Sequence, residues 1–333
     1  MQSNPIKTIF TGCMVVTIAI ATNGCDKDKN DARPQDNSRI PQVLTDNFNL
    51  TVMNTVVLRT HMKNELLKSG PYTLFAPSDE AFNKAGYGTV TAILGASQQL
   101  IDGMANYHVM PGLYDLQKMP FLFNQEIKSF SGKLFVTRWV KGQDTIITVN
   151  GSRLLSSGIS ASNGYVQVID RVLEPYRHEQ VGNAVAGEKS LTLFYHALRV
   201  AGMIPLLEGA GPLTVYAPAN DAMKAYGYPT LETIEATDPA ILRNMLRYHI
   251  AADRRFVNDY ILSTGSGSAT TQGMINNNSV KVTLVPDPQQ PGNFTGITLR
   301  GTGNTADVKL VRRDIIAGNG VLHITDQVLR INQ

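Results

Sequence analysis

Apolar residues recur at helical spacing in two stretches of the chain. The first covers residues 50–70, carries an apolar side chain every three or four positions, and ends at Gly70, a residue that commonly stops a helix. A second stretch with the same pattern begins at Leu191. Each is followed by a short apolar run, from Tyr72 and from Leu213, that leads directly into another helical pattern. The pattern predicts that helices dominate the start of each half of the chain.

The hydrophobic pattern changes period in the later part of each half. Apolar residues alternate with polar ones or form short apolar runs over 134–136, 146–148 and 165–168, and again over 280–284, 308–310 and 321–324. A period of two is typical of strands, and the Gly and Asn-Gly pairs between these segments supply turns. Helices followed by mostly antiparallel strands predict the α+β class for each half.

The two halves are copies of one module. The segment YTLFAPSDEAF at 72–82 returns as LTVYAPANDAM at 213–223, an offset of 141 residues, and the pairs Tyr107-His108 and Tyr248-His249 keep that offset. A later match, NGYVQVID at 163–170 with NGVLHITD at 319–326, has an offset of 156 and places about 15 extra residues in the second copy. Any account of the function must therefore explain a tandem module rather than one active site.

The first 24 residues have the features of a secretory signal peptide. Lys7 is their only charged residue, and an apolar run from Ile9 to Ala21 follows it, too short to span a bilayer. Cys25 follows Gly24 and resembles the acceptor of a bacterial lipoprotein cleavage box, with a polar tether after it over 25–45. The alternative is an uncleaved or conventionally cleaved signal with an incidental cysteine. Lipidation of Cys25 predicts a membrane anchor at the cell envelope.

Composition excludes some other classes of protein. The only cysteines are Cys13 and Cys25, so the chain after the signal has no internal disulfide. The formal net charge of +3 comes from 30 basic and 27 acidic residues without a long basic block, so we expect no nucleic-acid partner. No metal-ligand spacing among the six histidines and no nucleophile elbow is visible, which predicts no metal, no cofactor and no enzyme activity.

Several residues of the repeated motifs are candidates for structural or binding roles. Asp79 and its counterpart Asn220 are interpreted as helix caps, because an amide replaces a carboxylate without loss of the capping oxygen. The pairs Tyr107-His108 and Tyr248-His249 have two interpretations: a ligand contact or general base at the histidine, or a helix-to-strand junction in which the histidine bonds the backbone. Trp139 is either a core residue or an exposed binding contact.

The motif FAPSDEAF, the Tyr-His pair and the closing NGYVQVIDRVLEP together resemble the fasciclin-like domain family, twice in the same order. The resemblance covers module 1, residues 46–176, and module 2, residues 187–331, with a linker at 177–186. It implies two β-wedges with flanking helices and a role in adhesion, with the Tyr-His neighbourhood as an adhesion motif in some members. Tandem members with a lipid anchor look typical of bacterial envelope proteins. The resemblance therefore implies attachment to the outer membrane, and it leaves open whether the chain faces the periplasm or the outside.

The sequence therefore predicts a non-enzymatic, lipid-anchored surface protein that uses two fasciclin-like modules to hold a protein or glycan partner. A second hypothesis is an accessory subunit of an outer-membrane assembly for glycan or nutrient uptake. A third is a hydrolase that uses the Tyr-His region. Two modules on one tether raise the effective concentration of weak contacts, which favours the first.

Overall fold

A strand that is paired on both sides organises each module. The computed structural model describes residues 38–156 and 158–331. The strands of this small sheet are β1 (Tyr72–Pro77), β2 (Val109–Pro111) and β8 (Gly164–Ile169) in module 1, and β9 (Leu213–Pro218), β10 (Ile250–Ala251) and β15 (Gly320–Thr325) in module 2. β1 pairs antiparallel with β2 and parallel with β8, and β9 pairs in the same way with β10 and β15. All six residues of β1 and of β9 are buried, which explains why both read as apolar runs.

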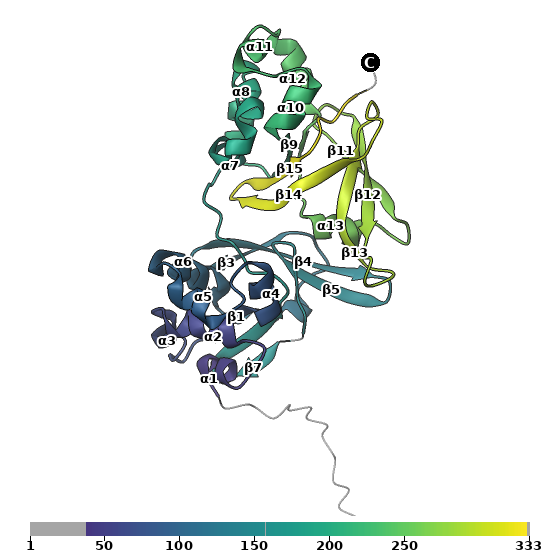
Figure 1. Cartoon of the computed structure of the whole chain (residues 1–333). Coiled ribbons are helices and arrows are strands. Elements are labelled where there is room, and N and C mark those ends of the chain that lie inside the picture. The colour runs from purple at the N-terminus through teal and green to yellow at the C-terminus, as the bar shows by residue number, and fades with distance from the viewer. Residues whose placement is uncertain (1–37, 157, 332–333) are drawn as a thin grey trace, which may run out of the picture. The chain divides into compact units, whose positions relative to one another are not determined.

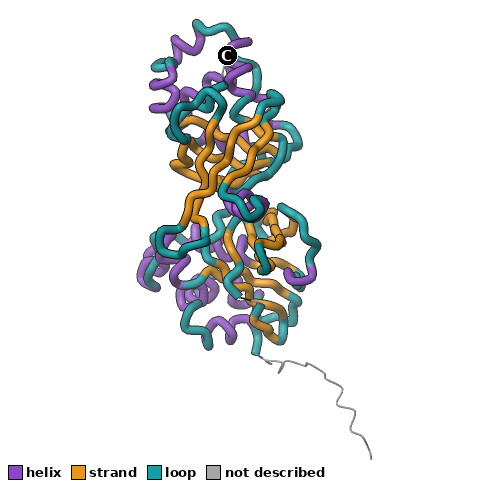
Figure 2. The backbone as a smooth tube through the Cα atoms, turned by 90° about the vertical axis from the view of Figure 1, so that its right-hand side faces the viewer, coloured by secondary structure: helices purple, strands orange, loops and turns teal. Residues whose placement is uncertain are grey.

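The remaining strands form antiparallel ladders, as the alternating pattern predicts (Figure 2). Module 1 has β3 (Gln125–Ser129), β4 (Gly132–Lys141), β5 (Asp144–Val149), β6 (Ser152–Arg153) and β7 (Ile159–Ala161), and module 2 has β11 (Ala269–Gly273), β12 (Ser279–Pro286), β13 (Phe294–Arg300) and β14 (Val308–Ala317). In module 2 they join β15 in one sheet of order β10-β9-β15-β14-β13-β12-β11. The α+β prediction is confirmed.

Short helices cover one side of each central strand (Figure 1). Those of module 1 are α2 (Thr51–Leu58), α3 (Met62–Glu65), α4 (Asp79–Lys84), α5 (Val90–Gly95), α6 (Gln98–His108) and the 3₁₀ turn η1 (Leu116–Lys118). Those of module 2 are η2 (Lys189–Leu191), α8 (Thr192–Val200), α9 (Ile204–Glu208), α10 (Asn220–Tyr226), α11 (Leu231–Glu235) and α12 (Pro239–Arg247). The helix α13 (Val257–Ser263) lies apart from these and packs on β12, β13 and β4. The helical pattern of 50–70 is thus split into α2 and α3. The corresponding break in module 2 follows from Gly202, at φ +65°, and from Pro205, which begins a helix but cannot continue one.

The prediction of a flexible tether over 25–45 was wrong at its end. Residues Ile40–Thr45 form α1, and Ile40, Val43 and Leu44 are buried in the core of module 1. The Ile40 N–H also donates to the Asn163 Oδ1, 3.0 Å away. Three apolar residues at helical spacing were too short a signal to identify in a polar context. The predicted signal peptide and Cys25 lie outside the described residues.

The predicted linker at 177–186 was also wrong over its second half. Val181–Gly187 form α7, whose Val181, Ala184 and Val185 enter the core of module 2. The Val181 N–H donates to the Asn319 Oδ1 at 2.7 Å, as Ile40 does to Asn163. α7 is therefore the copy of α1, and the repeat begins about ten residues earlier than the sequence comparison indicated.

Asp79 caps a helix other than the one expected. The cap of its own helix, α4, is Ser78, which accepts from the Ala81 N–H at 3.1 Å. The Asp79 carboxylate instead accepts from the N–H groups of Thr51 and Val52, at 3.3 and 2.9 Å, and so caps α2. In module 2, Asn220 accepts from the Leu193 N–H at 3.0 Å and from the Thr192 hydroxyl at 3.2 Å, at the start of α8. The motif residue thus binds α2 in module 1, and α8 in module 2, to the helix that follows the central strand.

Within the described residues, none of the helices is both long enough and apolar enough to traverse a bilayer.

We expect Asp79→Ala to lower the free energy of unfolding by about 1 kcal/mol, because the first amides of α2 lose their acceptor. Asp79→Asn is the matched control and should cost far less, since Asn220 performs the same task in module 2. Urea denaturation followed by circular dichroism measures both. Equal losses in the two variants would contradict the capping role.

Candidate binding site between the two modules

The histidine of each Tyr-His pair links a helix to the end of its module. The His108 side chain is fully buried, its Nδ1 lies 2.8 Å from the Met104 carbonyl oxygen, and its Nε2 lies 3.0 Å from the Leu173 nitrogen. The neutral ring therefore donates from Nδ1 and accepts at Nε2. The same contacts in module 2, both at 3.0 Å, join His249 to Met245 and Leu329. Burial lowers the pKa of His108 and of His249 to about 4, so both are neutral at pH 7.

The tyrosines of these pairs are buried as well. The Tyr107 hydroxyl donates to the Lys133 carbonyl oxygen at 2.8 Å and accepts from the Asn150 Nδ2 at 3.0 Å. The Tyr248 hydroxyl donates to the Ser279 carbonyl oxygen at 2.8 Å. Every polar side-chain atom of the two pairs is thus bonded inside its own module, and none is free to contact a partner. This geometry favours the interpretation as a helix-to-strand junction.

The two modules lie within one compact unit, residues 36–333, and a carboxylate of module 2 binds module 1 directly. Asp259 in α13 is fully buried. Its oxygens accept from the Asn124 Nδ2 at 2.9 Å and the Thr137 Oγ1 at 3.0 Å, both in module 1, and from the Phe256 N–H at 2.9 Å, which caps α13. Burial raises the pKa of Asp259 to about 6, and the three donors oppose that rise.

A buried guanidinium lies beside this carboxylate. Arg254 donates to three carbonyl oxygens of its own module at 2.8 to 3.1 Å, namely those of Ala317, Gly318 and Gly320. Its Cζ lies 3.7 Å from the centroid of the Phe135 ring in module 1. Burial lowers the pKa of Arg254 to about 10, which leaves the group charged at pH 7. Around it, Phe135 packs with Phe256 and Val321 in an apolar cluster that crosses the contact.

Polar contacts continue along both edges of this interface. The Arg171 Nη1 lies 3.1 Å from the Asp314 Oδ2, while the Asp314 Oδ1 accepts from the Val257 N–H at 2.8 Å. The Lys141 Nζ donates to the Gly265 carbonyl oxygen at 2.8 Å. Asp314 has a left-handed backbone, at φ +59°, and module 1 carries Gly158 at the matching position. The side chain that makes the contact is therefore specific to the second copy.

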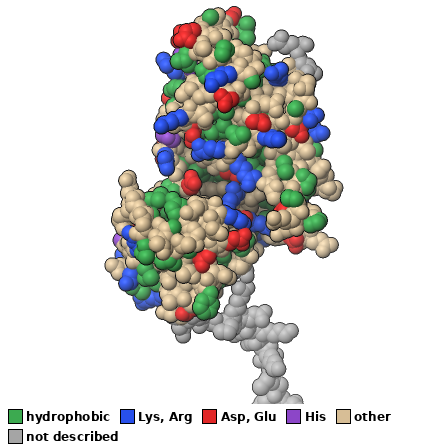
Figure 3. All heavy atoms as spheres, viewed as in Figure 1, with side chains coloured by type: hydrophobic (Ala, Val, Ile, Leu, Met, Phe, Trp, Pro, Cys, Tyr) green, Lys and Arg blue, Asp and Glu red, His purple; other side chains and the backbone are tan. Residues whose placement is uncertain are grey.

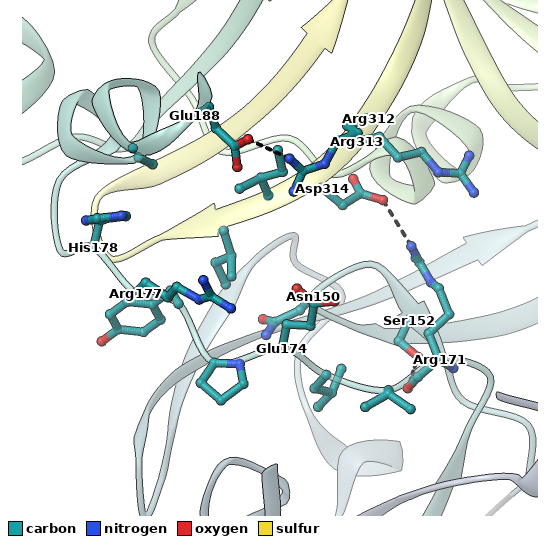
Figure 4. Close-up of a pocket in the computed structure, with 18 residues that line it drawn as sticks. Asn150, Ser152, Arg171, Glu174, Arg177, His178, Glu188, Arg312, Arg313 and Asp314 are labelled. Atoms are coloured by element: carbon teal, nitrogen blue, oxygen red, sulfur yellow. Dashed lines mark hydrogen bonds and ion pairs between the residues drawn. The ribbon is translucent and has the colours of Figure 1, made fainter. Parts of the chain in front are cut away.

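A cavity of about 440 Å³ lies next to Arg171 and Asp314 (Figure 4). The connection between the modules forms one wall and β14 forms another. Four arginines, one histidine and three carboxylates line it. The Arg312 Nη1 lies 2.6 Å from the Glu188 Oε2, so a second ion pair accompanies that of Arg171 with Asp314. Figure 3 shows Lys and Arg side chains gathered in the middle of this face, where the modules meet.

The aromatic cluster of module 1 divides between core and surface. Phe135 is buried at the module contact, whereas the Trp139 ring is half-buried, with its centroid 4.6 Å from that of Phe123. Phe121 is 45% exposed, and the Arg138 guanidinium lies 3.8 Å from its ring centroid. Trp139 thus packs mainly on its own neighbours.

Among residues 38–156 and 158–331, no group of three or more His, Cys, Asp or Glu side chains is arranged to hold a metal ion. The motif histidines also lack a nucleophile, since each ring nitrogen is engaged with the backbone.

Sequence reasoning missed Arg254 and Asp259. Their counterparts 141 positions earlier are Leu113 and Lys118, so neither belongs to the repeated motifs. A comparison of the two copies for positions where the residue type changes could have found them, because a side chain present in only one copy can serve a contact that only that copy makes.

Comparisons with known proteins give one family for both modules. The sequence model described as Fasciclin domain matches residues 48–175 and 189–331. Periostin from Homo sapiens is 27% identical over 280 residues, which cover 80% of this chain and 29% of periostin. Transforming growth factor-beta-induced protein ig-h3 from Sus scrofa is 24% identical over 268 residues, covering 80% and 36% of the two chains. The chain thus spans about a third of the length of these relatives.

A solved domain pair from the insect cell adhesion molecule fasciclin I aligns with 84% of this chain and 96% of its own, at 16% identity and a TM-score of 0.41.

We expect acid to destabilise the modules through the buried histidines. Because the folded pKa of His108 and His249 is about 4 and the unfolded pKa is about 6.5, the unfolded chain binds more protons between these values. Each histidine then lowers the free energy of unfolding by up to about 1.4 kcal/mol per pH unit as the pH falls from 6.5 to 4. Asp259 acts in the opposite direction below pH 6, because its pKa is raised.

Urea denaturation at several pH values measures this dependence. His108→Gln should be less stable at pH 7, because one of two backbone contacts is lost, but its stability should fall less steeply with acid. His61→Gln, at an exposed position, is the control and should behave as the wild type. An unchanged pH slope in His108→Gln would rule out the buried neutral ring.

We expect Asp259→Ala to separate the modules. The change leaves the Thr137 hydroxyl and the Phe256 N–H buried without their acceptor, while the Asn124 amide keeps only the Arg254 carbonyl oxygen, at a total cost of about 3 kcal/mol. Calorimetry should then show two unfolding transitions in place of one. Asp221→Ala, at an exposed carboxylate of α10, is the control and should keep one transition. If Asp259→Ala also unfolds in a single unshifted transition, the carboxylate does not hold the modules together.

Proposed function

Because the chain belongs to the fasciclin domain family, we propose that it is a non-enzymatic binding protein that holds a protein or glycan partner at the cell surface. The observation that carries this proposal is the buried contact between the two modules. Asp259 and Arg254 join the modules into one body, so that surfaces of both face a partner with a fixed spacing. Two weak contacts made by one body add with little further loss of entropy.

The geometry of the repeated motifs supports a role other than catalysis. A general base needs a ring nitrogen that can reach a substrate, and the nitrogens of His108 and His249 are both occupied and buried. The same burial argues against direct adhesion through the Tyr-His pairs. We therefore place the partner contact on the outer surface of the module pair and beside the connection between the modules.

We further propose that Cys25 carries a lipid that anchors the chain in the cell envelope, at the outer membrane. Residues after Cys25 then form a polar tether as far as α1. More than one acyl chain on Cys25 gives a stable attachment, since a single chain binds membranes only marginally. Neither nucleic acid nor a cofactor has a part in this function.

The test uses cells that produce the full chain, or its Cys25→Ala variant, and that receive a fatty-acid analogue before surface cross-linking. We expect the wild type to take up the label and to recover an envelope or surface partner, identified by mass spectrometry. Cys25→Ala should remain unlabelled. Asp259→Ala should keep the label and lose most of the partner, because its modules no longer act as one body.

Recovery of transporter subunits as the main partner would instead favour the accessory role in glycan or nutrient uptake. A wild-type chain that recovers no partner under broad screening contradicts the proposed function.

A further inference from the structure

Most of the charged side chains that line the 440 Å³ cavity are paired with one another or point away from it. Two arginines are neutralised in the ion pairs Arg171–Asp314 and Arg312–Glu188 (Figure 4). Arg313 donates to the Thr295 carbonyl oxygen, and its guanidinium turns away from the cavity in Figure 4. Arg177 and His178 on one side and Glu174 on the other complete the titratable lining.

Arg177 is the cation best placed to receive a ligand. It is exposed, it comes from the connection between the modules, and its guanidinium points into the cavity toward Asn150 (Figure 4). Its side chain forms no ion pair with any of the residues that the structure describes. A guanidinium offers two parallel N–H donors that match the two oxygens of a carboxylate. This position therefore selects for an anionic group.

The rest of the lining suits a ligand rich in hydroxyl groups. The Arg312–Glu188 pair is partly exposed, at 56% and 24%, and so presents donors next to acceptors, whereas the other pair presents only the Arg171 donors, since Arg171 is 33% exposed and Asp314 only 6%. A hydroxyl both donates and accepts, and so it can bond to such a pair without breaking it. Val172, Pro175 and Ile316 add apolar surface for C–H groups. A compact dianion such as phosphate fits less well, because Arg177 alone supplies an unpaired guanidinium that points into the cavity, and it matches one negative charge.

We propose that this cavity binds a short acidic saccharide, with a sugar carboxylate on Arg177 and sugar hydroxyls on the two ion pairs. The volume lies within the range of about 300–1,000 Å³ that small-ligand sites occupy. This inference rests on the proposed function and names its glycan partner by chemistry. Because residues of both modules line the cavity, the site exists only while the modules stay in contact.

Isothermal titration of the full chain tests this assignment with a uronic-acid disaccharide and with the same disaccharide after reduction of its carboxylate to an alcohol. We expect the acidic form to bind at least about tenfold more tightly, since a charged hydrogen bond is lost in the neutral form. Arg177→Gln should remove that preference. Arg199→Gln, at an exposed arginine of α8 outside the cavity, should retain it.

Thermal unfolding confirms that Arg177→Gln is folded before its binding is compared. The proposal is overturned if neither disaccharide binds, if both bind equally, or if inorganic phosphate binds as tightly as the acidic disaccharide. If the disaccharide does not bind but the chain still captures a partner on cells, only the saccharide site is ruled out. Failure of partner capture in a chain that still binds the disaccharide removes the adhesion role and leaves the site.

Discussion

A carboxylate and a guanidinium from one short segment of module 2 enter the contact with module 1 without facing water. Burial of either charge is costly, and the cost is offset only when each finds enough partners. Asp259 has three donors, two of them across the contact, and Arg254 has three carbonyl oxygens and an aromatic face. Such groups add little net stability compared with an apolar contact, but they reject any other alignment, since a shift would leave them unpaired. The cavity and its ion pairs depend on that alignment.

The architecture of each module was predictable because it is written in periodic and repeated signals. The uninterrupted apolar runs of β1 and β9 marked the buried central strands, and alternation marked the ladders. The same signals do not say which partner a polar atom finds. Asp79 looked like the cap of its own helix, yet its oxygens reach α2, which lies 27 residues earlier. α1 escaped because six residues with three apolar positions do not stand out from a polar segment.

The site between the modules could not be found from repetition, because it uses the positions at which the copies differ. Asp314 replaces Gly158, and Arg254 and Asp259 replace Leu113 and Lys118. A contact between unlike faces of two similar bodies could continue to a third body if both copies carried both faces. Divergence of the copies removes that option: the face with the donors Asn124 and Thr137 and the Phe135 ring belongs to module 1, and the segment with the accepting Asp259 belongs to module 2. The asymmetry makes the pair a closed unit.

The hydrogen bond from the Ile40 N–H to the Asn163 Oδ1 bears load when the chain is pulled from the side that precedes α1. Tension that arrives through the residues before α1 is met by the bond from the Ser162 N–H to the Ser38 carbonyl oxygen, then by the Ile40–Asn163 bond and three buried apolar side chains, and only afterwards by the hydrogen bonds of β1 with β8. The helix therefore peels away before the sheet is loaded, and its six residues release up to about 20 Å of extended chain. The helix α1 therefore extends under a sudden load before the sheet is strained, and it can refold when the load is removed.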